Sequence, residues 1–202
     1  MKTLGVTGGI GSGKSAVCRV LGDLGARVVY ADAVAKRLMH EDATLRSEIA
    51  AAFGAGSYDA GGALNRAHLA ARVFGDEAQV ARLNAIVHPR VRAEMLRLID
   101  AARADGVALL VYEAALIFET GADALLDAVA VVDAPVETRV ARVMARDGAT
   151  REAVLARMGH QLPPADLRAR ADFVIENGGG LAALRSQVEA LYVDLAPGDA
   201  GA

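Results

Sequence analysis

A glycine-rich segment near the start of the chain constrains the fold more than any other feature. It reads GGIGSGKS at residues 8–15 and lies between an apolar, strand-like segment, 3–7, and a helical pattern, 15–24. The spacing Gly-x4-Gly-Lys-Ser is that of a phosphate loop, in which backbone N–H groups and a helix N-terminus surround phosphate oxygens. The segment therefore predicts a protein that binds a nucleoside triphosphate.

Two side chains of this segment have specific expected roles. Lys14 should reach the β and γ phosphate oxygens, and the Ser15 hydroxyl should be a ligand of Mg²⁺. Only Lys2, Lys14 and Lys36 are lysines among the 22 Lys and Arg residues, so a lysine here is informative. We expect the nucleotide to be bound by Gly8, Gly9, Ile10, Gly11, Ser12, Gly13, Lys14, Ser15 and Ala16.

The composition excludes several classes of protein. With 202 residues, of which 53% are hydrophobic, the chain is long enough for one domain with an ordinary core. A net charge of −3 gives no reason to expect nucleic acid or an anionic membrane as a partner. The single cysteine, Cys18, rules out an internal disulfide and is expected to be a buried apolar residue on a helix. We expect a soluble, cytoplasmic protein with no membrane span.

Short β-branched runs alternate with helical patterns along the chain. This alternation predicts an α/β fold with about five parallel strands and helices on both faces. The expected strands are 3–7, 27–30, 107–112, 128–132 and 173–175. Helices are expected to begin after Pro89 and after Pro135, because proline suits a first helical turn. A last helix is expected around 184–191, and Thr150 is a plausible N-cap of another.

Two connections are too long to be simple crossovers, and long insertions in compact domains are commonly functional. The first contains three helical patterns, at 45–53, 69–74 and 80–87, and we interpret it as an acceptor-binding insert. The second is rich in arginine, and we interpret it as a lid. The predicted organisation is one domain with a core at 1–32, 106–140 and 171–196, an insert at 33–105, a lid at 141–170 and a frayed tail at 197–202.

A small kinase fits this organisation best. The chain lacks the Asn/Thr-Lys-x-Asp motif by which a GTPase reads guanine. Two alternatives remain: a kinase for another small metabolite or nucleotide, and a nucleotide-binding regulatory module without catalysis. An aspartate after the second strand, an insert and an arginine-rich lid favour an enzyme over the regulatory module.

The sequence resembles the dephospho-coenzyme A kinase family over nearly its whole length. Segments similar to that family's are TGGIGSGKS at 7–15, ADAVAKRL at 31–38, LNRAHLAARVFGD at 64–76, LNAIVHPRV at 83–91, RVMARDGATREAVLARMGHQ at 142–161 and ADFVIENGG at 171–179. The resemblance implies ATP-dependent phosphorylation of the ribose 3′-hydroxyl of dephospho-coenzyme A, with Mg²⁺. The chain departs from the family's Asp-x-Pro-Leu-Leu-Phe-Glu run, having EAALIFE at 113–119, and it has Ala16 where threonine is common.

The resemblance also assigns roles to individual residues. Asp32, after the second strand, is the expected catalytic carboxylate and acceptor contact; its alternative is a helix N-cap. Arg139, Arg142 and Arg146 form one helical stripe, from which the resemblance selects Arg142 and Arg146 as catalytic; the alternative is a solvated face. The remaining expected contacts are Asn177 for the nucleotide and Arg66, His88 and Arg90 for the acceptor. Arg157 and Gln161 are expected to share a face of one helix, and Glu113 has a Walker-B-like place after an apolar strand.

Overall fold

The computed structural model describes residues 1–73 and 75–196 and divides into two compact units. The first unit contains residues 1–30 and the chain from Ile99 onward, and the second is Ala31–Leu98. The predicted tail at 197–202, and Phe74 of one predicted helical pattern, lie outside the described residues.

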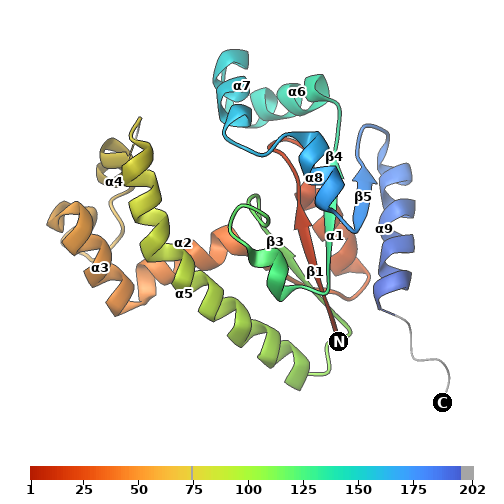
Figure 1. Cartoon of the computed structure of the whole chain (residues 1–202), viewed down its shortest axis with the longest axis horizontal. Coiled ribbons are helices and arrows are strands. Elements are labelled where there is room, and N and C mark those ends of the chain that lie inside the picture. Colours follow the sequence, from red (N-terminus) through yellow and green to blue (C-terminus); the bar gives the residue numbers. More distant parts are fainter. Residues whose placement is uncertain (74, 197–202) are drawn as a thin grey trace. The chain divides into compact units, whose positions relative to one another are not determined.

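The first unit is built on a parallel sheet, as predicted. Its strands are β1 (Lys2–Thr7), β2 (Arg27–Tyr30), β3 (Leu109–Glu113), β4 (Ala128–Asp133) and β5 (Phe173–Glu176), in the order β2-β3-β1-β4-β5 (Figure 1). All five correspond to predicted strands: β2 has the predicted bounds, and the ends of the others differ by at most two residues. The three central strands, β1, β3 and β4, are buried on both faces, which is typical of parallel sheets, whereas the edge strands β2 and β5 are partly exposed.

The strand order explains where the glycine-rich segment lies. The chain leaves β1 toward β2 on one side of the sheet, and β4 and β5 lie on the other side. The carboxyl end of β1 is therefore a topological switch point, the place where ligands bind in such sheets. In the register, Val6 pairs with Glu113 and Thr7 with Val131, so the segments after β1, β3 and β4 emerge at the same edge.

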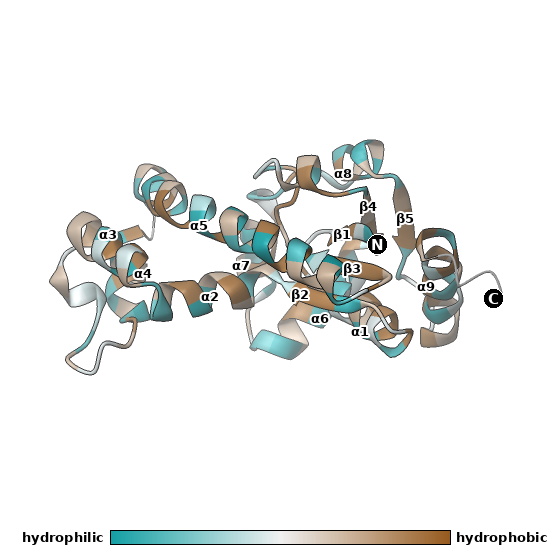
Figure 2. Ribbon diagram, turned by 90° about the horizontal axis from the view of Figure 1, so that it is seen from below, coloured by the Kyte–Doolittle hydropathy of each residue, from teal (hydrophilic) through white to brown (hydrophobic). Residues whose placement is uncertain are grey.

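Helices cover one face of the sheet with a continuous apolar core. α1 (Lys14–Asp23) and α9 (Leu181–Leu195) pack there, with Leu4, Val17, Leu21 and Val188 in the shared core. Figure 2 shows the central strands as apolar ribbon. On the opposite face the segment after β3, with η2 (Ala122–Leu125), covers Gly5. The remaining helices are α6 (Val136–Asp147), α7 (Arg151–Gly159) and α8 (Pro164–Arg170).

Several local predictions are confirmed in this unit. Cys18 is buried on α1, and burial raises the pKa of its thiol to about 12. Pro135 precedes α6, and the Thr150 hydroxyl accepts a hydrogen bond from the Ala153 N–H at 3.3 Å as the N-cap of α7. One prediction is wrong: Gln161 does not lie on α7, because that helix ends at Gly159 and its C-cap is His160.

The second unit is helical. It contains α2 (Ala31–Glu41), α3 (Ala43–Phe53), η1 (Ala55–Ser57), α4 (Arg66–Val73) and most of α5 (Glu77–Ala104). Its core consists of Leu45, Ile49, Phe53, Leu69 and Val87. These residues belong to the three apolar patterns that predicted helices in the insert, although Val80, the first residue of the third pattern, is exposed. No helix among residues 1–73 and 75–196 combines the length and the apolar character needed to cross a membrane.

The prediction that a helix begins after Pro89 is wrong. Pro89 lies inside α5, which is one helix of 28 residues. Proline lacks the N–H that would bond to the carbonyl of Ala85, and its ring disfavours a helix interior. The apolar stripe nevertheless continues across it, since Val87 and Val91 pack in the same cluster. Burial on both sides of the proline therefore outweighs its local preference.

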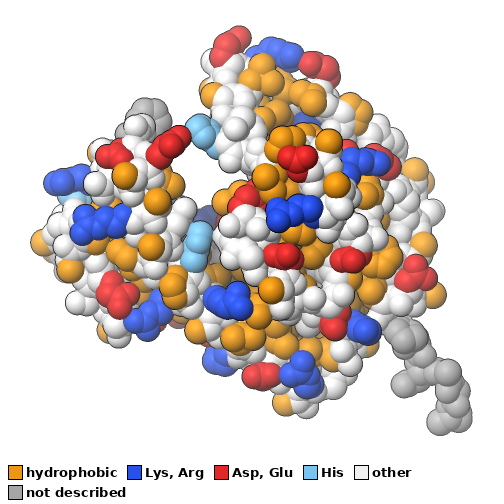
Figure 3. Space-filling view, viewed as in Figure 1, with side chains coloured by type: hydrophobic (Ala, Val, Ile, Leu, Met, Phe, Trp, Pro, Cys, Tyr) orange, Lys and Arg blue, Asp and Glu red, His pale blue; other side chains and the backbone are white. Residues whose placement is uncertain are grey.

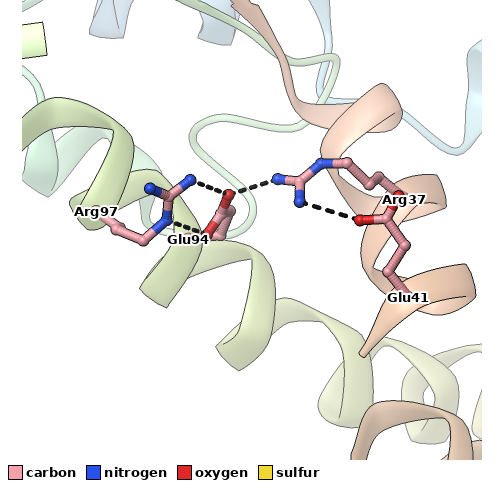
Figure 4. A network of polar contacts seen from close by, with 4 residues as sticks. All are labelled: Arg37, Glu41, Glu94 and Arg97. Atoms are coloured by element: carbon pink, nitrogen blue, oxygen red, sulfur yellow. Dashed lines mark hydrogen bonds and ion pairs between the residues drawn. The ribbon is translucent and has the colours of Figure 1, made fainter. Parts of the chain in front are cut away.

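An ion-pair network joins α2 to α5 within the second unit (Figure 4). Glu94 bonds to Arg37 and, through both its oxygens, to Arg97 at 2.8 Å. Arg37 also contacts Glu41, at 3.5 Å. The hydrogen bonds from Arg97 and then from Arg37 lower the pKa of Glu94 to about 2. On the face shown in Figure 3, acidic and basic side chains are interspersed, in keeping with the net charge of −3.

Candidate active site

The glycine-rich segment forms a turn that leads from β1 directly into α1. The Ser12 N–H donates to the Gly9 carbonyl at 3.0 Å, and the Ala16 N–H donates to the Gly13 carbonyl at 2.9 Å. Gly13 is the N-cap of α1, in the left-handed region at φ 96°, and it offers no side-chain cap. The first turn of α1 is thus not capped by a side chain, and the helix dipole favours an anion there.

Lys14 and Ser15 occupy the first turn of α1. The Lys14 ammonium donates to the Gly8 carbonyl at 2.8 Å, so this side chain folds back over the glycine-rich turn. Ser15 is exposed. Ser12, in contrast, is 1% exposed, and its hydroxyl is buried with no hydrogen-bond partner among the described residues. Ser12 can therefore contribute to anion binding only through its backbone.

Arg142 and Asn177 both contact the turn. The Arg142 guanidinium donates to the Ser12 carbonyl at 3.3 Å and to the Asn177 carbonyl at 3.0 Å. The Asn177 amide is buried, and its Nδ2 donates to the Ser12 carbonyl at 2.7 Å. The structure thus brings both predicted residues to the loop. It shows the Asn177 side chain supporting the turn, while the predicted nucleotide contact of Asn177 stays a prediction.

Arg146 lies one turn further along α6 and is bound to a carboxylate. Its guanidinium forms two hydrogen bonds with Asp147, at 2.6 and 3.0 Å, and Arg157 contacts the same carboxylate at 3.0 Å. Bonds from Arg146 and then Arg157 hold the pKa of Asp147 well below its usual range. The Asp147 carboxylate therefore stays charged and holds two exposed arginines of α6 and α7 together.

Two carboxylates, Glu113 and Glu119, lie at and after the carboxyl end of β3. Glu113 is the last residue of β3, and its charge raises the pKa of Cys18 on α1, second to burial, whereas Lys14 lowers it. The charges of Glu113 and Lys14 thus both act on Cys18, in opposite directions. Glu119 lies further on, where its carboxylate accepts a 3.4 Å hydrogen bond from the Leu162 N–H, after α7.

Asp32 lies in the second unit, in the first turn of α2. It is exposed, and the helix begins at Ala31, so Asp32 is inside the helix rather than its N-cap. The N-cap alternative is therefore wrong. A carboxylate in the first turn is still favoured by the helix dipole. Its side chain is accessible to solvent, as a group that meets a substrate must be.

The predicted acceptor contacts also lie in the second unit. Arg66 is exposed at the start of α4. His88 is exposed on α5, and the surrounding protein lowers the pKa of its imidazole by desolvation. Arg90 donates to Glu48 at 3.0 Å and lies 3.9 Å from Asp42. An anionic ligand would have to compete with these carboxylates for Arg90.

Two residues at the turn were not predicted as part of the site. Arg139 is 5% exposed, and its Nε donates to the Ile10 carbonyl at 3.0 Å. Burial lowers the pKa of Arg139, and the charge of Asp133 opposes this effect. Gln161 accepts a 2.8 Å hydrogen bond from the Ile10 N–H. The sequence placed Arg139 at the start of the arginine stripe and Gln161 on a helix face with Arg157, but it indicated no contact of either residue with the turn.

The fold and this turn define a class of protein. A parallel sheet with an anion-binding loop between β1 and α1, a lysine and a hydroxyl in the first helical turn, and arginines on the loop belong to a small phosphate-loop kinase. The same fold occurs in a shikimate kinase from Acinetobacter baumannii, at a TM-score of 0.51 and 15% identity over all of this chain and 96% of that one. At that identity the likeness concerns the fold alone.

Comparison with known sequences identifies the family. A family model for dephospho-CoA kinase matches residues 2–183, and the chain belongs to this family. It is 52% identical to the dephospho-CoA kinase of Salinibacter ruber, over 95% of this chain and 96% of that one. It is 50% identical to the dephospho-CoA kinase of Deinococcus radiodurans, over 94% and 90% respectively. A solved structure from Thermus thermophilus matches with a TM-score of 0.81 and 38% identity, covering 96% and 97%.

Membership of this family decides between the alternatives left open by the sequence. The protein is an ATP-dependent kinase that phosphorylates dephospho-CoA, the final step of coenzyme A synthesis, as the resemblance implied. The two other possibilities, a kinase for a different small metabolite and a regulatory module without catalysis, are set aside.

Proposed function

We propose that the turn at residues 8–16 holds the ATP phosphates and that Asp32 takes the proton from the acceptor hydroxyl. The observation that carries the first part is the N-terminus of α1. Its N–H groups have no side-chain cap, Gly13 is left-handed, and Lys14 already reaches across to the Gly8 carbonyl. On nucleotide binding, Lys14 exchanges this neutral carbonyl for negatively charged phosphate oxygens, so that donor and acceptor are both charged and the contact is stronger.

The proposed reaction is a direct transfer of the γ-phosphoryl group. The ribose 3′-oxygen of dephospho-CoA forms a bond to the γ-phosphorus, while the bond from that phosphorus to the β,γ-bridging oxygen breaks. The hydroxyl proton passes to the Asp32 carboxylate, and ADP leaves with the electron pair of the broken bond. Arg142 and Arg146 neutralise charge on the moving group; Arg142 is already at the loop, and Arg146 first gives up Asp147.

Mg²⁺ is part of this proposal, and the donor atoms available suit it. Mg²⁺ prefers oxygen ligands and keeps several waters, so it needs few groups from the protein. Ser15 presents a hydroxyl in the first turn of α1, and Glu113 ends the neighbouring strand opposite Val6. These two residues would hold the ion, Ser15 directly and Glu113 through water. When bound, Mg²⁺ offsets negative charge on the phosphate oxygens.

The second unit is proposed to bind the acceptor. Arg66, His88 and Arg90 supply cationic or hydrogen-bonding groups suited to the phosphates of dephospho-CoA. Arg90 would exchange Glu48 for a phosphate, as Lys14 exchanges the Gly8 carbonyl. We propose a cytoplasmic location as well. It is supported by the one cysteine, Cys18, which is buried and reduced.

Replacement of Asp32 tests the proposal. Asp32→Asn keeps the shape of the side chain and removes its capacity to take a proton. We expect turnover to fall by about 10²–10⁴, the usual contribution of a general base. ATP affinity and melting temperature should stay close to those of the wild type, because Asp32 is exposed.

Asp100→Asn is the matched control. It removes an exposed carboxylate on α5 that forms an ion pair with Arg103. Its turnover should equal that of the wild type. If Asp32→Asn also turns over like the wild type, Asp32 is not the base.

A further inference from the structure

The peptide units on both sides of Ile10 are held by side chains from distant parts of the chain. The Ile10 carbonyl accepts from Arg139 Nε at 3.0 Å, and the Ile10 N–H donates to Gln161 Oε1 at 2.8 Å. Arg139 comes from α6 and Gln161 from the segment between α7 and α8. Both are therefore more than a hundred residues from Ile10 along the chain, and a glycine-rich turn has little stiffness of its own.

These contacts fix the direction of two peptide planes. In a trans peptide the C=O and the following N–H point in opposite directions. With the Ile10 carbonyl turned toward Arg139, the Gly11 N–H must point away from α6. The preceding unit is fixed at both ends, because its Gly9 carbonyl accepts from the Ser12 N–H at 3.0 Å and its Ile10 N–H is held by Gln161.

The side of the turn that faces α6 is filled. A Cβ on Gly11 would come 2.4 Å from the Arg139 carbonyl, and a Cβ on Gly9 would come 2.0 Å from Arg139 Nη2. The backbone of Arg139 fills the first space, and its guanidinium occupies the second. The Gly11 N–H is directed toward the other side of the turn, where a phosphate can accept its hydrogen bond.

We propose that Arg139 and Gln161 are positioning residues for ATP. They orient the two peptide units around Ile10 so that the Gly11 N–H is presented to the phosphates before the nucleotide arrives. Gln161 also makes the segment between α7 and α8 part of the phosphate loop's support. This inference goes beyond the assigned family activity and concerns how the turn is kept in its binding conformation.

Two substitutions at Arg139 separate its hydrogen bond from its charge. Arg139→Met removes the donor and the charge, whereas Arg139→Gln places an amide nitrogen where Nε was and removes only the charge. We expect Arg139→Met to weaken ATP binding and raise the KM for ATP about tenfold, the worth of one hydrogen bond from a charged group. Arg139→Gln should remain within about twofold of the wild type, since its bond to Ile10 is neutral but retained.

The KM for dephospho-CoA should be unchanged in both variants. A general loss of folding would lower the apparent turnover and leave both KM values unchanged, so a raised KM for ATP alone reports the loss of positioning. Arg185→Met is the control, because it makes the same change at an exposed arginine on α9 that pairs with Glu189. If Arg139→Gln is as defective as Arg139→Met, or if Arg139→Met binds ATP like the wild type, the proposal is overturned.

Gln161→Met tests the second contact. Because Gln161 is only half-buried, this substitution disturbs the packing less than one at the buried Arg139. The exchange rate of the Ile10 amide proton, followed by NMR, reports the bond directly. We expect faster exchange in the variant and ATP affinity lowered about threefold to tenfold. Exchange and affinity equal to those of the wild type would overturn the proposal, and so would faster exchange with no change in affinity.

Discussion

The amide nitrogen of Asn177 occupies the space that a side chain at residue 13 would need. A Cβ on Gly13 would lie 2.0 Å from Asn177 Nδ2, which itself donates to the Ser12 carbonyl at 2.7 Å. Gly13 also has φ 96°, a region that side chains disfavour. Asn177, directly after the last strand β5, thus donates a hydrogen bond that stabilises the turn just before α1 begins.

This relationship predicts the effect of changing Asn177. Asn177→Asp keeps the shape but replaces the donor by an oxygen that faces the Ser12 carbonyl in a buried place. We expect a loss of about 1–3 kcal/mol in the free energy of unfolding, together with weaker ATP binding. Denaturant unfolding and calorimetric titration with ATP measure the two effects. An unfolding curve like that of the wild type would show that the contact does not support the turn.

The two arginines of α6 should differ in what they affect when removed. Arg142→Met and Arg146→Met should each lower turnover by about 30-fold to 1,000-fold, equivalent to about 2–4 kcal/mol for one electrostatic contact to the moving group. Arg142→Met should also weaken ATP binding, because Arg142 contacts the loop carbonyls, whereas Arg146→Met should not.

Arg151→Met is the control for this pair, since Arg151 is exposed on α7 and pairs with Glu137. Steady-state kinetics with both substrates distinguishes the variants. Wild-type turnover in both Arg142→Met and Arg146→Met would mean that the stripe only carries solvated charge.

The fold and the nucleotide loop can be predicted from local sequence, whereas the side chains that contact the loop from distant segments cannot. Strands are short and β-branched with turn residues at their ends, so their positions are evident. The loop is evident because glycine, lysine and serine act there through their own backbone or first helical turn. The stripe Arg139, Arg142 and Arg146 looks uniform in sequence, yet Arg139 is buried and Arg146 exposed.

The difference in burial between these arginines arises only from packing between distant segments of the chain. The burial of Arg139 comes from its position beside the turn at residues 9–11, more than a hundred residues away. The contact of Gln161 with Ile10 has the same origin, and Gln161 lies outside any helix. A single sequence carries no local signal for such pairs.

The Glu94 network predicts how stability depends on pH. The pKa of Glu94 is lowered to about 2 from an ordinary value of 4.5, first by Arg97 and then by Arg37. A carboxylate whose pKa is depressed by folding stabilises the protein above its unfolded pKa, and this stabilisation is lost as pH falls toward the folded pKa. The contribution of Glu94 should therefore be complete above about pH 5 and disappear toward pH 2.

Glu94→Gln isolates this contribution from those of other carboxylates, such as Asp147, whose pKa is also low. The difference in free energy of unfolding between wild type and variant, measured by denaturant titration, should shrink steadily from pH 5 to pH 2. A difference that is constant over this range would contradict the assigned role of Glu94.

The proposed Mg²⁺ site predicts a specific defect for Ser15→Ala. Loss of the hydroxyl should raise the Mg²⁺ concentration needed for half-maximal turnover, while ATP binding in the absence of Mg²⁺ stays unchanged. Ser15→Thr keeps a hydroxyl and should behave like the wild type. Ser186→Ala, at an exposed position on α9, is the control. An unchanged Mg²⁺ requirement in Ser15→Ala would remove Ser15 from the metal site.

Pro89 is placed where a helix should not tolerate it, next to two residues proposed to bind the acceptor. Within α5 it removes the bond to the Ala85 carbonyl, and proline costs about 3 kcal/mol relative to alanine in a helix interior. Local rules are usually violated at functional sites rather than elsewhere. The unfavourable proline is therefore expected to serve the local geometry of His88 and Arg90.

Pro89→Ala should increase stability and impair use of the acceptor. We expect the free energy of unfolding to rise by about 1–3 kcal/mol, because the helix gains a hydrogen bond and a better helix former. The KM for dephospho-CoA should rise while the KM for ATP does not, since the proposed ATP site lies in the first unit. Pro164→Ala is the matched control: Pro164 is the first residue of α8, where proline fits, so no stabilisation is expected. If Pro89→Ala leaves the KM for dephospho-CoA unchanged, the proline has no part in acceptor binding.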